Sequence, residues 1–232
     1  VDLTNLLMEA GRLADAGKAA ASALQTAAND GERGIALGLT GDIQVMSGDP
    51  TNGRKTFEQA LEVLNRAAAA DPAGVQIQRS LMAVYDRIGD LSDSERDFAG
   101  ARAAYAAELA IGRRMAAAAP DDIRAQRDLA ICLAKIGDAY TSVEDYRQAQ
   151  ASYEELVTIT RKVLATAPGN LDFQRDHGLA LLKMGEFFLD IRDKGRARPL
   201  LAEGGLTARR LAAADPTNVV WRRDLAVALE KQ

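Results

Sequence analysis

The hydrophobic positions of the chain recur at helical spacing. In the middle of the sequence apolar residues fall three or four positions apart, at Leu129, Leu133, Ile136 and Tyr140. This spacing places them on one face of an α-helix. After a short polar stretch a second helical stripe follows, at Ala149, Tyr153, Leu156 and Val163. The pattern predicts two amphipathic helices that pack against each other.

The helix pair recurs with a fixed period. Four residue types keep a step of 48 residues along the chain: Pro72, Pro120, Pro168 and Pro216; Arg79, Arg127, Arg175 and Arg223; Gly41, Gly89, Gly137 and Gly185; and Asp49, Asp97, Asp145 and Asp193. Proline lacks an amide hydrogen and restricts the residue before it, so each proline predicts the end of a second helix. Just after it, Asn170 and either Asp121 or Asp122 are suited to cap the next first helix. The period predicts a tandem array of helix pairs.

This register divides the chain into repeats and leaves no separate second domain. The predicted single solenoid, 1–232, comprises a second helix of a preceding or capping unit at 1–30, repeats at 31–72, 73–120, 121–168 and 169–216, and a terminal first helix at 217–232. A lone terminal helix is typical of a cap with a polar outer face. The alternative is that the chain is an excised piece of a longer protein.

Composition supports helix and narrows the range of partners. Hydrophobic residues make up 47% of the chain and aromatic ones 5%, and alanine runs at 67–70 and 116–119 favour helix. The net charge of −4 argues against a nucleic-acid partner. The single cysteine, Cys132, excludes an internal disulfide and fits a reducing compartment, so we expect a cytoplasmic protein. Since no stretch of about 18 uncharged apolar residues occurs, we expect no membrane contact.

The sequence offers little for catalysis or metal binding. Its one histidine, His177, has no second histidine with which to build a metal site. His177 takes the register position of leucines and Cys132 that of valine and alanine, so both are interpreted as packing residues. The acidic turn at 90–97 lacks the glycine of a calcium loop, and no phosphate loop ends in Gly-Lys-Ser or Gly-Lys-Thr. We expect no catalytic residue, no cofactor and no metal.

The third repeat resembles the tetratricopeptide repeat (TPR) family. The family spacing of apolar and aromatic residues around Leu-Gly and alanine is matched by Leu133, Ile136-Gly137, Tyr140, Ala149 and Tyr153, and again by Leu181, Met184-Gly185, Phe188, Ala197 and Leu201. The resemblance covers about residues 31–232 and implies an all-α, right-handed superhelical solenoid of antiparallel helix pairs. The period exceeds the usual family length of about 34 residues and resembles a subgroup found in bacterial multidomain proteins.

The resemblance also implies a partner and a surface. In the family the first helices line a concave groove that binds protein segments, so a protein or peptide partner is expected. The candidate partner-binding residues of the first helices are Arg79, Asp86, Asp90, Arg127, Ile131, Ala134, Asp138, Arg175, Leu182 and Glu186. An alternative interpretation is that the repeated arginines form a ladder of ion pairs with Asp128, Asp176 or Asp224. Acids stand where some family members carry the asparagine of a carboxylate clamp, which favours a basic or amide-rich partner segment.

The predicted function is therefore a protein-interaction or scaffold module, acting as the regulatory or sensing region of a larger protein. One alternative is a self-associating array that builds a dimer or filament from its end helices. RNA binding by helical repeats is a third interpretation, but the acidic charge and few aromatic residues fit it poorly.

Overall fold

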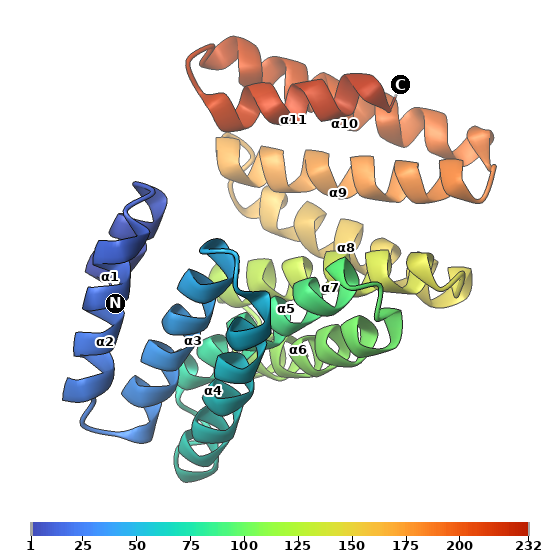
Figure 1. The fold of residues 1–232 in the computed structure, drawn as a ribbon. Helices are drawn as coiled ribbons and strands as arrows, with labels where there is room; N and C mark the ends of the chain where they lie inside the picture. The colour runs from blue at the N-terminus through green and yellow to red at the C-terminus, as the bar shows by residue number, and fades with distance from the viewer. Residues whose placement is uncertain (1, 232) are drawn as a thin grey trace. The chain divides into compact units, whose positions relative to one another are not determined.

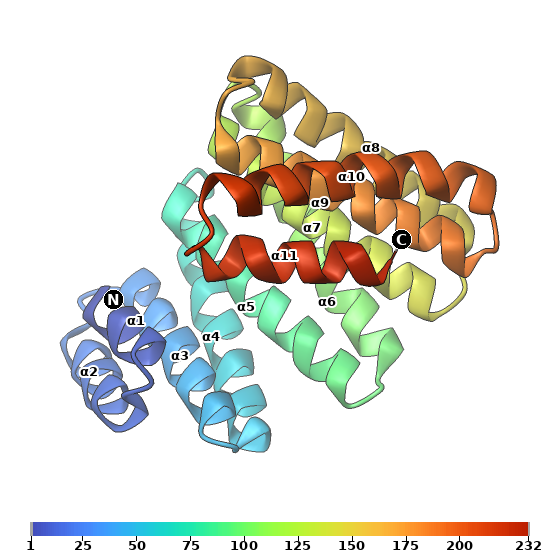
Figure 2. The same ribbon diagram turned by 90° about the horizontal axis from the view of Figure 1, so that it is seen from above.

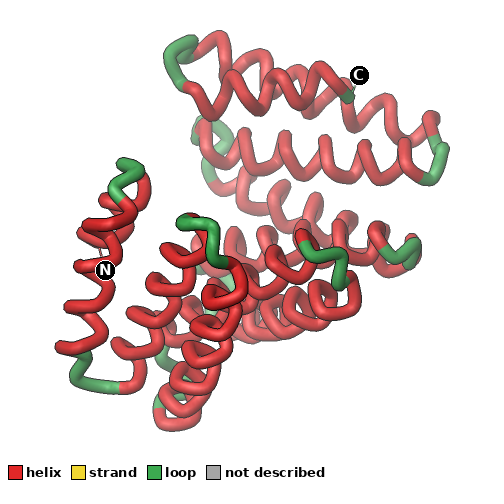
Figure 3. The backbone as a smooth tube through the Cα atoms, viewed as in Figure 1, coloured by secondary structure: helices red, strands yellow, loops and turns green. Residues whose placement is uncertain are grey.

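The computed structural model of the protein describes residues 2–231, and this part of the chain folds entirely into helices and turns (Figures 1 and 3). The eleven helices are α1 (Asp2–Glu9), α2 (Leu13–Thr26), α3 (Asp30–Met46), α4 (Pro50–Ala70), α5 (Val75–Ser94), α6 (Phe98–Ala118), α7 (Ile123–Ser142), α8 (Tyr146–Thr166), α9 (Leu171–Asp190), α10 (Lys194–Ala214) and α11 (Val219–Glu230). The solenoid was predicted over residues 1–232, and its first and last residues, Val1 and Gln232, lie outside the described residues. The all-α prediction is confirmed.

The 48-residue period of the sequence is also the period of the helices. The second helices α4, α6, α8 and α10 begin 48 residues apart, and so do the first helices α5, α7, α9 and α11. Asn170 accepts hydrogen bonds from the amides of Asp172 and Phe173, and Asp122 accepts one from Arg124, so both predicted residues cap first helices. Each period therefore supplies one helix pair.

The chain forms two compact units, which divide between Met115 and Ala116. In the N-terminal unit α2 packs on α3, α3 on α4, and α4 on α5. In the C-terminal unit α7 packs on α8, α8 on α9, α9 on α10, and α10 on α11, and neighbouring helices run in opposite directions (Figures 1 and 2). Within each unit the pairs stack in chain order, while the single array over the whole chain stays a prediction.

The N-terminal segment differs from the prediction of one second helix at 1–30. It forms two short helices, α1 and α2, because the chain reverses around Gly11, whose φ of 71° suits a residue without a Cβ. Ala16 and Ala20 of α2 are buried against Ile43 of α3, and α1 adds Leu7 and Met8 to this cluster. The prediction of a single helix is therefore wrong.

One turn recurs between the two helices of every pair. It places Gly48, Arg96, Glu144 and Arg192 in the left-handed region, with φ of 87°, 63°, 60° and 63°. In the third pair the amide of Asp145 donates to the carbonyl of Tyr140 at 2.9 Å, and that of Glu144 donates to Thr141 at 3.0 Å. These two bonds are those of a Schellman motif, which ends a helix.

The aspartate that follows each of these residues begins the next helix. In the third pair the side chain of Asp145 accepts a hydrogen bond from the amide of Gln148 and caps α8. Asp49 and Asp193 cap α4 and α10 in the same way, and Asp97 accepts from the amide of Gly100 at 2.9 Å. Because one residue closes the first helix with its amide and caps the second with its carboxylate, aspartate keeps the 48-residue period.

The periodic glycine has a different cause. A Cβ at Gly89 would lie 2.4 Å from the ring of Tyr105, and one at Gly137 would lie 2.7 Å from the ring of Tyr153. Both tyrosines are buried, and each belongs to the second helix of its pair. A side chain on the first helix would push the two helices apart, so the glycine lets the aromatic ring fill the contact.

Candidate functional site

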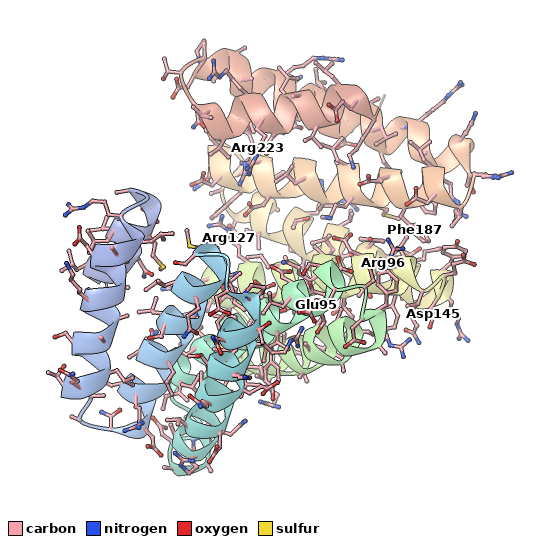
Figure 4. All side chains as sticks on the ribbon, in the orientation of Figure 1. Glu95, Arg96, Arg127, Asp145, Phe187 and Arg223 are labelled. Carbon is pink, nitrogen blue, oxygen red and sulfur yellow. The ribbon has the colours of Figure 1, made fainter. Side chains whose placement is uncertain are left out.

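The predicted partner-binding residues of α7, which are Arg127, Ile131, Ala134 and Asp138, form a stripe that borders a groove in the C-terminal unit. The groove has a volume of about 690 Å³, and its lining comes from α7, α8 and α9. Arg127, Ile131 and Ala134 of the predicted set line it, and Figure 4 labels Arg127 among them. Ile131 is 56% exposed, so it leaves apolar surface uncovered at the groove. The stripe was predicted for a binding surface, and the structure places it beside a groove.

Most of the groove is apolar. Its apolar lining residues are Ile123, Ala130, Ile131 and Ala134 from α7, Leu156, Ile159 and Val163 from α8, and Phe173, Leu179 and Ala180 from α9. The charged side chains at its border are Arg124, Arg127, Asp128, Asp176 and Lys183. An apolar groove with a few polar groups at its edge has the character of a ligand site.

The repeated arginines join one first helix to the next. Nε of Arg127 on α7 lies 2.6 Å from Oδ2 of Asp176 on α9, and Nε of Arg175 on α9 lies 2.5 Å from Oδ2 of Asp224 on α11. Its hydrogen bond with Asp224 raises the pKa of Arg175. The two pairs have the geometry of the ion-pair ladder that was the alternative interpretation of these arginines. Their contact with a partner stays a prediction.

A second ladder uses the acid that follows the periodic glycine. Asp138 on α7 pairs with Lys183 on α9, with Oδ2 and Nζ 2.6 Å apart, and Glu186 on α9 pairs with Lys231. In the N-terminal unit Oδ1 of Asp42 lies 2.8 Å from Nε of Arg87, at the same spacing in sequence. These acids therefore form ion pairs between neighbouring first helices.

Asp138 has a further internal partner. The hydroxyl of Tyr153 on α8 donates to Oδ1 of Asp138 at 2.7 Å. Burial of the ring and the charge of Asp138 both raise the pKa of Tyr153, so the hydroxyl stays protonated. One oxygen of Asp138 is thus occupied within its own helix pair and the other by Lys183.

The candidates of the N-terminal unit lie on α5 and are also engaged within the protein. Arg79 and Asp86 are half-buried, and Oδ2 of Asp86 lies 2.9 Å from Nη1 of Arg87. Asp90 accepts a hydrogen bond from the hydroxyl of Tyr105 at 2.6 Å. Burial and the neighbouring Asp90 raise the pKa of Tyr105. The contact of Asp90 with Tyr105 repeats that of Asp138 with Tyr153.

Leu182 is the candidate that the structure moves away from the surface. Its side chain is 3% exposed and lies over Gly204 of α10, where a Cβ would approach Cγ of Leu182 to 2.8 Å. Leu182 stands where α7 has Ala134, and the larger side chain turns into the core because Gly204 leaves room for it. Leu182 is therefore a packing residue in this structure.

A smaller, acidic recess continues the stripe of α7 toward its C-terminus. It has a volume of about 310 Å³ and is lined by Asp138, Thr141, Tyr153, Lys183, Glu186, Phe187 and Asp190. Figure 4 labels Phe187, whose ring centroid lies 5.5 Å from that of Tyr153. Burial and the charge of Glu186 raise the pKa of Asp190. The lining has three acids, Asp138, Glu186 and Asp190, and one lysine, Lys183, so the recess is acidic.

His177 and Cys132 both lie in the core. Nδ1 of His177 lies 3.0 Å from Oγ1 of Thr160, and burial lowers the pKa of the imidazole. Cys132 is fully buried, and its thiol donates to the carbonyl of Asp128 at 3.2 Å. Among residues 2–231 no three His, Cys, Asp or Glu side chains lie close enough together to bind a metal ion. Within the same residues no helix is both long enough and apolar enough to span a bilayer.

Comparisons with known proteins agree with this architecture. Neither a protein-family model nor a curated protein matches the sequence. A thermophilic TPR protein from Thermus thermophilus is similar in structure, with a TM-score of 0.54 and 18% identity over 99% of this chain and 97% of its own. The chain has a TPR-type fold. BtubC from P. vanneervenii is also similar, with a TM-score of 0.69 and 16% identity over 93% of this chain and 79% of its own. At these identities the likeness shows the fold alone, and the 48-residue subgroup stays a prediction.

Within the TPR-type fold the predicted stripe supplied only one wall of the groove. Leu156 and Val163 were predicted as part of a packed stripe and are buried, at 4% and 5% exposed, but the sequence did not indicate that together with Ile159 they form the floor of a groove. Asp190 was also missed. A signal for it exists in the register, since Ser94 and Ser142 stand at the same position in the two preceding repeats.

Proposed function

We propose that this chain is a protein-interaction module that binds a segment of another protein along its first helices. The observation that carries the proposal is the apolar groove of about 690 Å³ between α7 and α9, with the exposed Ile131 in its wall. Exposed apolar surface of this kind gains free energy when a partner covers it. The TPR-type fold supports the proposal, because stacked repeats present extended surfaces of this kind.

The same proposal includes a regulatory or sensing role within a larger multidomain protein. It rests on the 48-residue period, which resembles that of repeat arrays in bacterial multidomain proteins. In this role the groove would transmit the presence of its partner to an attached domain.

The test is selection of random peptides displayed on phage against the full chain, followed by hydrogen–deuterium exchange with each enriched peptide. We expect enriched peptides to slow amide exchange in α7 and α9, whose faces border the groove. If no peptide is enriched above an immobilised control, or if the slowed amides lie in second helices only, the proposal is refuted.

Self-association is a second candidate, favoured by the exposed apolar surface of α11. Val219, Val220 and Leu229 are 67%, 44% and 51% exposed. Leu229 stands at the register position of Leu133 and Leu181, which are buried under second helices. Sedimentation equilibrium over a hundred-fold range of concentration tests this candidate, since a constant monomer mass refutes it and a mass that rises with concentration supports it.

A further inference from the structure

The apolar groove and the acidic recess are two parts of one surface. Both lie between α7 and α9, and Lys183 lines both. Along α7 the groove is bordered by Arg127, Ile131 and Ala134, and the recess by Asp138 and Thr141. The ion pair of Lys183 with Asp138 lies at the border between the two parts. A segment that fills the groove and continues along α7 therefore reaches the recess.

The charges of the two parts differ. In the apolar part Arg127 and Asp176 neutralise each other. In the recess Lys183 neutralises Asp138, and Lys231 neutralises Glu186, so the carboxylate of Asp190 is left over. Asp190 is exposed, and the charge of Lys231 acts on it as well, but that lysine forms its ion pair with Glu186. The recess therefore carries one uncompensated negative charge, which attracts a cation.

We infer that this surface recognises a peptide segment with two or three bulky apolar side chains followed by one lysine or arginine. The inference rests on the proposed function and names the partner's chemistry. The apolar side chains cover Ile131, and the cation meets Asp190 beside Glu186. Ile131 and Asp138 are seven residues apart, which is about 10 Å along a helix. An extended partner spans this distance with about three residues and a helical one with about seven.

The recognition is confined to one junction of the C-terminal unit. The corresponding space between α9, α10 and α11 has a volume of only about 10 Å³. There Leu182 takes the position of Ala134 and Gly204 that of Leu156, and Leu182 fills the space itself. The junction of α9 with α11 therefore leaves no comparable space for the apolar side chains of a partner.

The test measures fluorescence anisotropy of a labelled peptide that contains Leu-Ile-Ser-Ser-Arg, titrated with the full chain. Two matched peptides replace the arginine by glutamate or both apolar residues by serine. The variants are Ile131→Glu in the groove and Asp190→Lys in the recess. Their controls are Leu206→Glu, an apolar residue of α10 that is 45% exposed, and Glu58→Lys, an exposed acid of α4.

We expect the arginine peptide to bind and both matched peptides to bind more weakly. Ile131→Glu should weaken binding about ten-fold or more, and Asp190→Lys about five-fold, while the two controls leave it unchanged. Asp190→Lys should also bind the glutamate peptide better than the parent chain does. Asp190→Ser introduces the residue of the two preceding repeats and should give an intermediate loss, which separates charge from folding.

Equal binding of the arginine and glutamate peptides would overturn the inference, and so would an equal loss with Leu206→Glu and Ile131→Glu. If the chain forms a dimer that the peptide dissociates, a second copy of the chain competes with the peptide for the groove. This result would assign the groove to self-association instead. The proposed function fails separately. If the random selection enriches acidic peptides that protect α7 and α9, the interaction module stands and the inferred chemistry is wrong.

Discussion

The ion pair between Arg175 and Asp224 should stabilise the protein more than an exposed pair. Nε of Arg175 donates to Oδ2 at 2.5 Å and Nη2 donates to Oδ1 at 3.3 Å. The two side chains are 26% and 11% exposed. The pair of Lys183 with Asp138 has a similar distance of 2.6 Å, but its side chains are 39% and 48% exposed. Water therefore screens the second pair much more than the first.

The different exposure of the two pairs sets the expected changes in the free energy of unfolding. Arg175→Ala should lower the free energy of unfolding by about 2–3 kcal/mol. It leaves the nearly buried carboxylate of Asp224 without its hydrogen-bond donor. Asp224→Ala should cost only about 1 kcal/mol, since the guanidinium keeps access to water. In a double-mutant cycle the coupling energy of this pair should be about 1–2 kcal/mol. The coupling of Lys183 with Asp138 should be below about 0.5 kcal/mol.

The assay is urea unfolding followed by circular dichroism for both cycles, with all single and double alanine variants of the full chain. The comparison holds where the dependence on urea, the m-value, stays the same among variants. A coupling of Arg175 with Asp224 no larger than that of the exposed pair would refute the reasoning. So would an equal loss of stability in Arg175→Ala and Asp224→Ala.

Three further predictions concern the turns and the core. Glu144→Gly should raise the free energy of unfolding by about 0.5–1 kcal/mol in thermal unfolding, because Glu144 has a φ of 60° and Gly48 forms the same turn without strain. Asp145→Ala should lower it by about 1 kcal/mol in the same assay, because α8 loses its cap. Burial lowers the pKa of His177 from 6.5, so the unfolded state binds more protons and stability should fall as the pH drops from about 6.5 through the folded pKa. In His177→Leu this fall should disappear from urea midpoints measured between about pH 7 and pH 5, and a slope equal to that of the parent would contradict it.

The fold was predictable because one period fixed several independent features. Proline predicted the end of each second helix, whereas the aspartate was recognised in the sequence only as a periodic residue, and the structure shows that it caps the start of the second helix. The glycine of each pair and the large residue opposite it, Tyr153 in the third repeat and Leu201 in the fourth, were recognisable together, because a close contact between two helices needs a small residue opposite a large one. Such features repeat because each helix pair solves the same packing problem.

The N-terminal segment and the groove were not predictable in this way. Around Gly11 the register has drifted, and no periodic residue marked the reversal of the chain. The groove depends on how far α7 and α9 separate over α8, which is set by side chains from three helices at once. The helical pattern of Leu156 and Val163 indicates that they are buried against a neighbouring helix, which the structure confirms, but it does not show that they also line a groove.

The periodic contacts depend on residues that repeat, whereas the groove depends on residues that differ between repeats. Arg127 and Arg175 keep the register, and in both repeats they perform the same task of joining two first helices. The groove exists where the register is broken, with Ala134 against Leu182. A repeat that copied its neighbour at every position would present the same surface at every junction and would give a partner no preferred place. Positions that hold the helices together therefore repeat, whereas Ala134 and Asp190, which depart from their counterparts, give one junction a surface of its own.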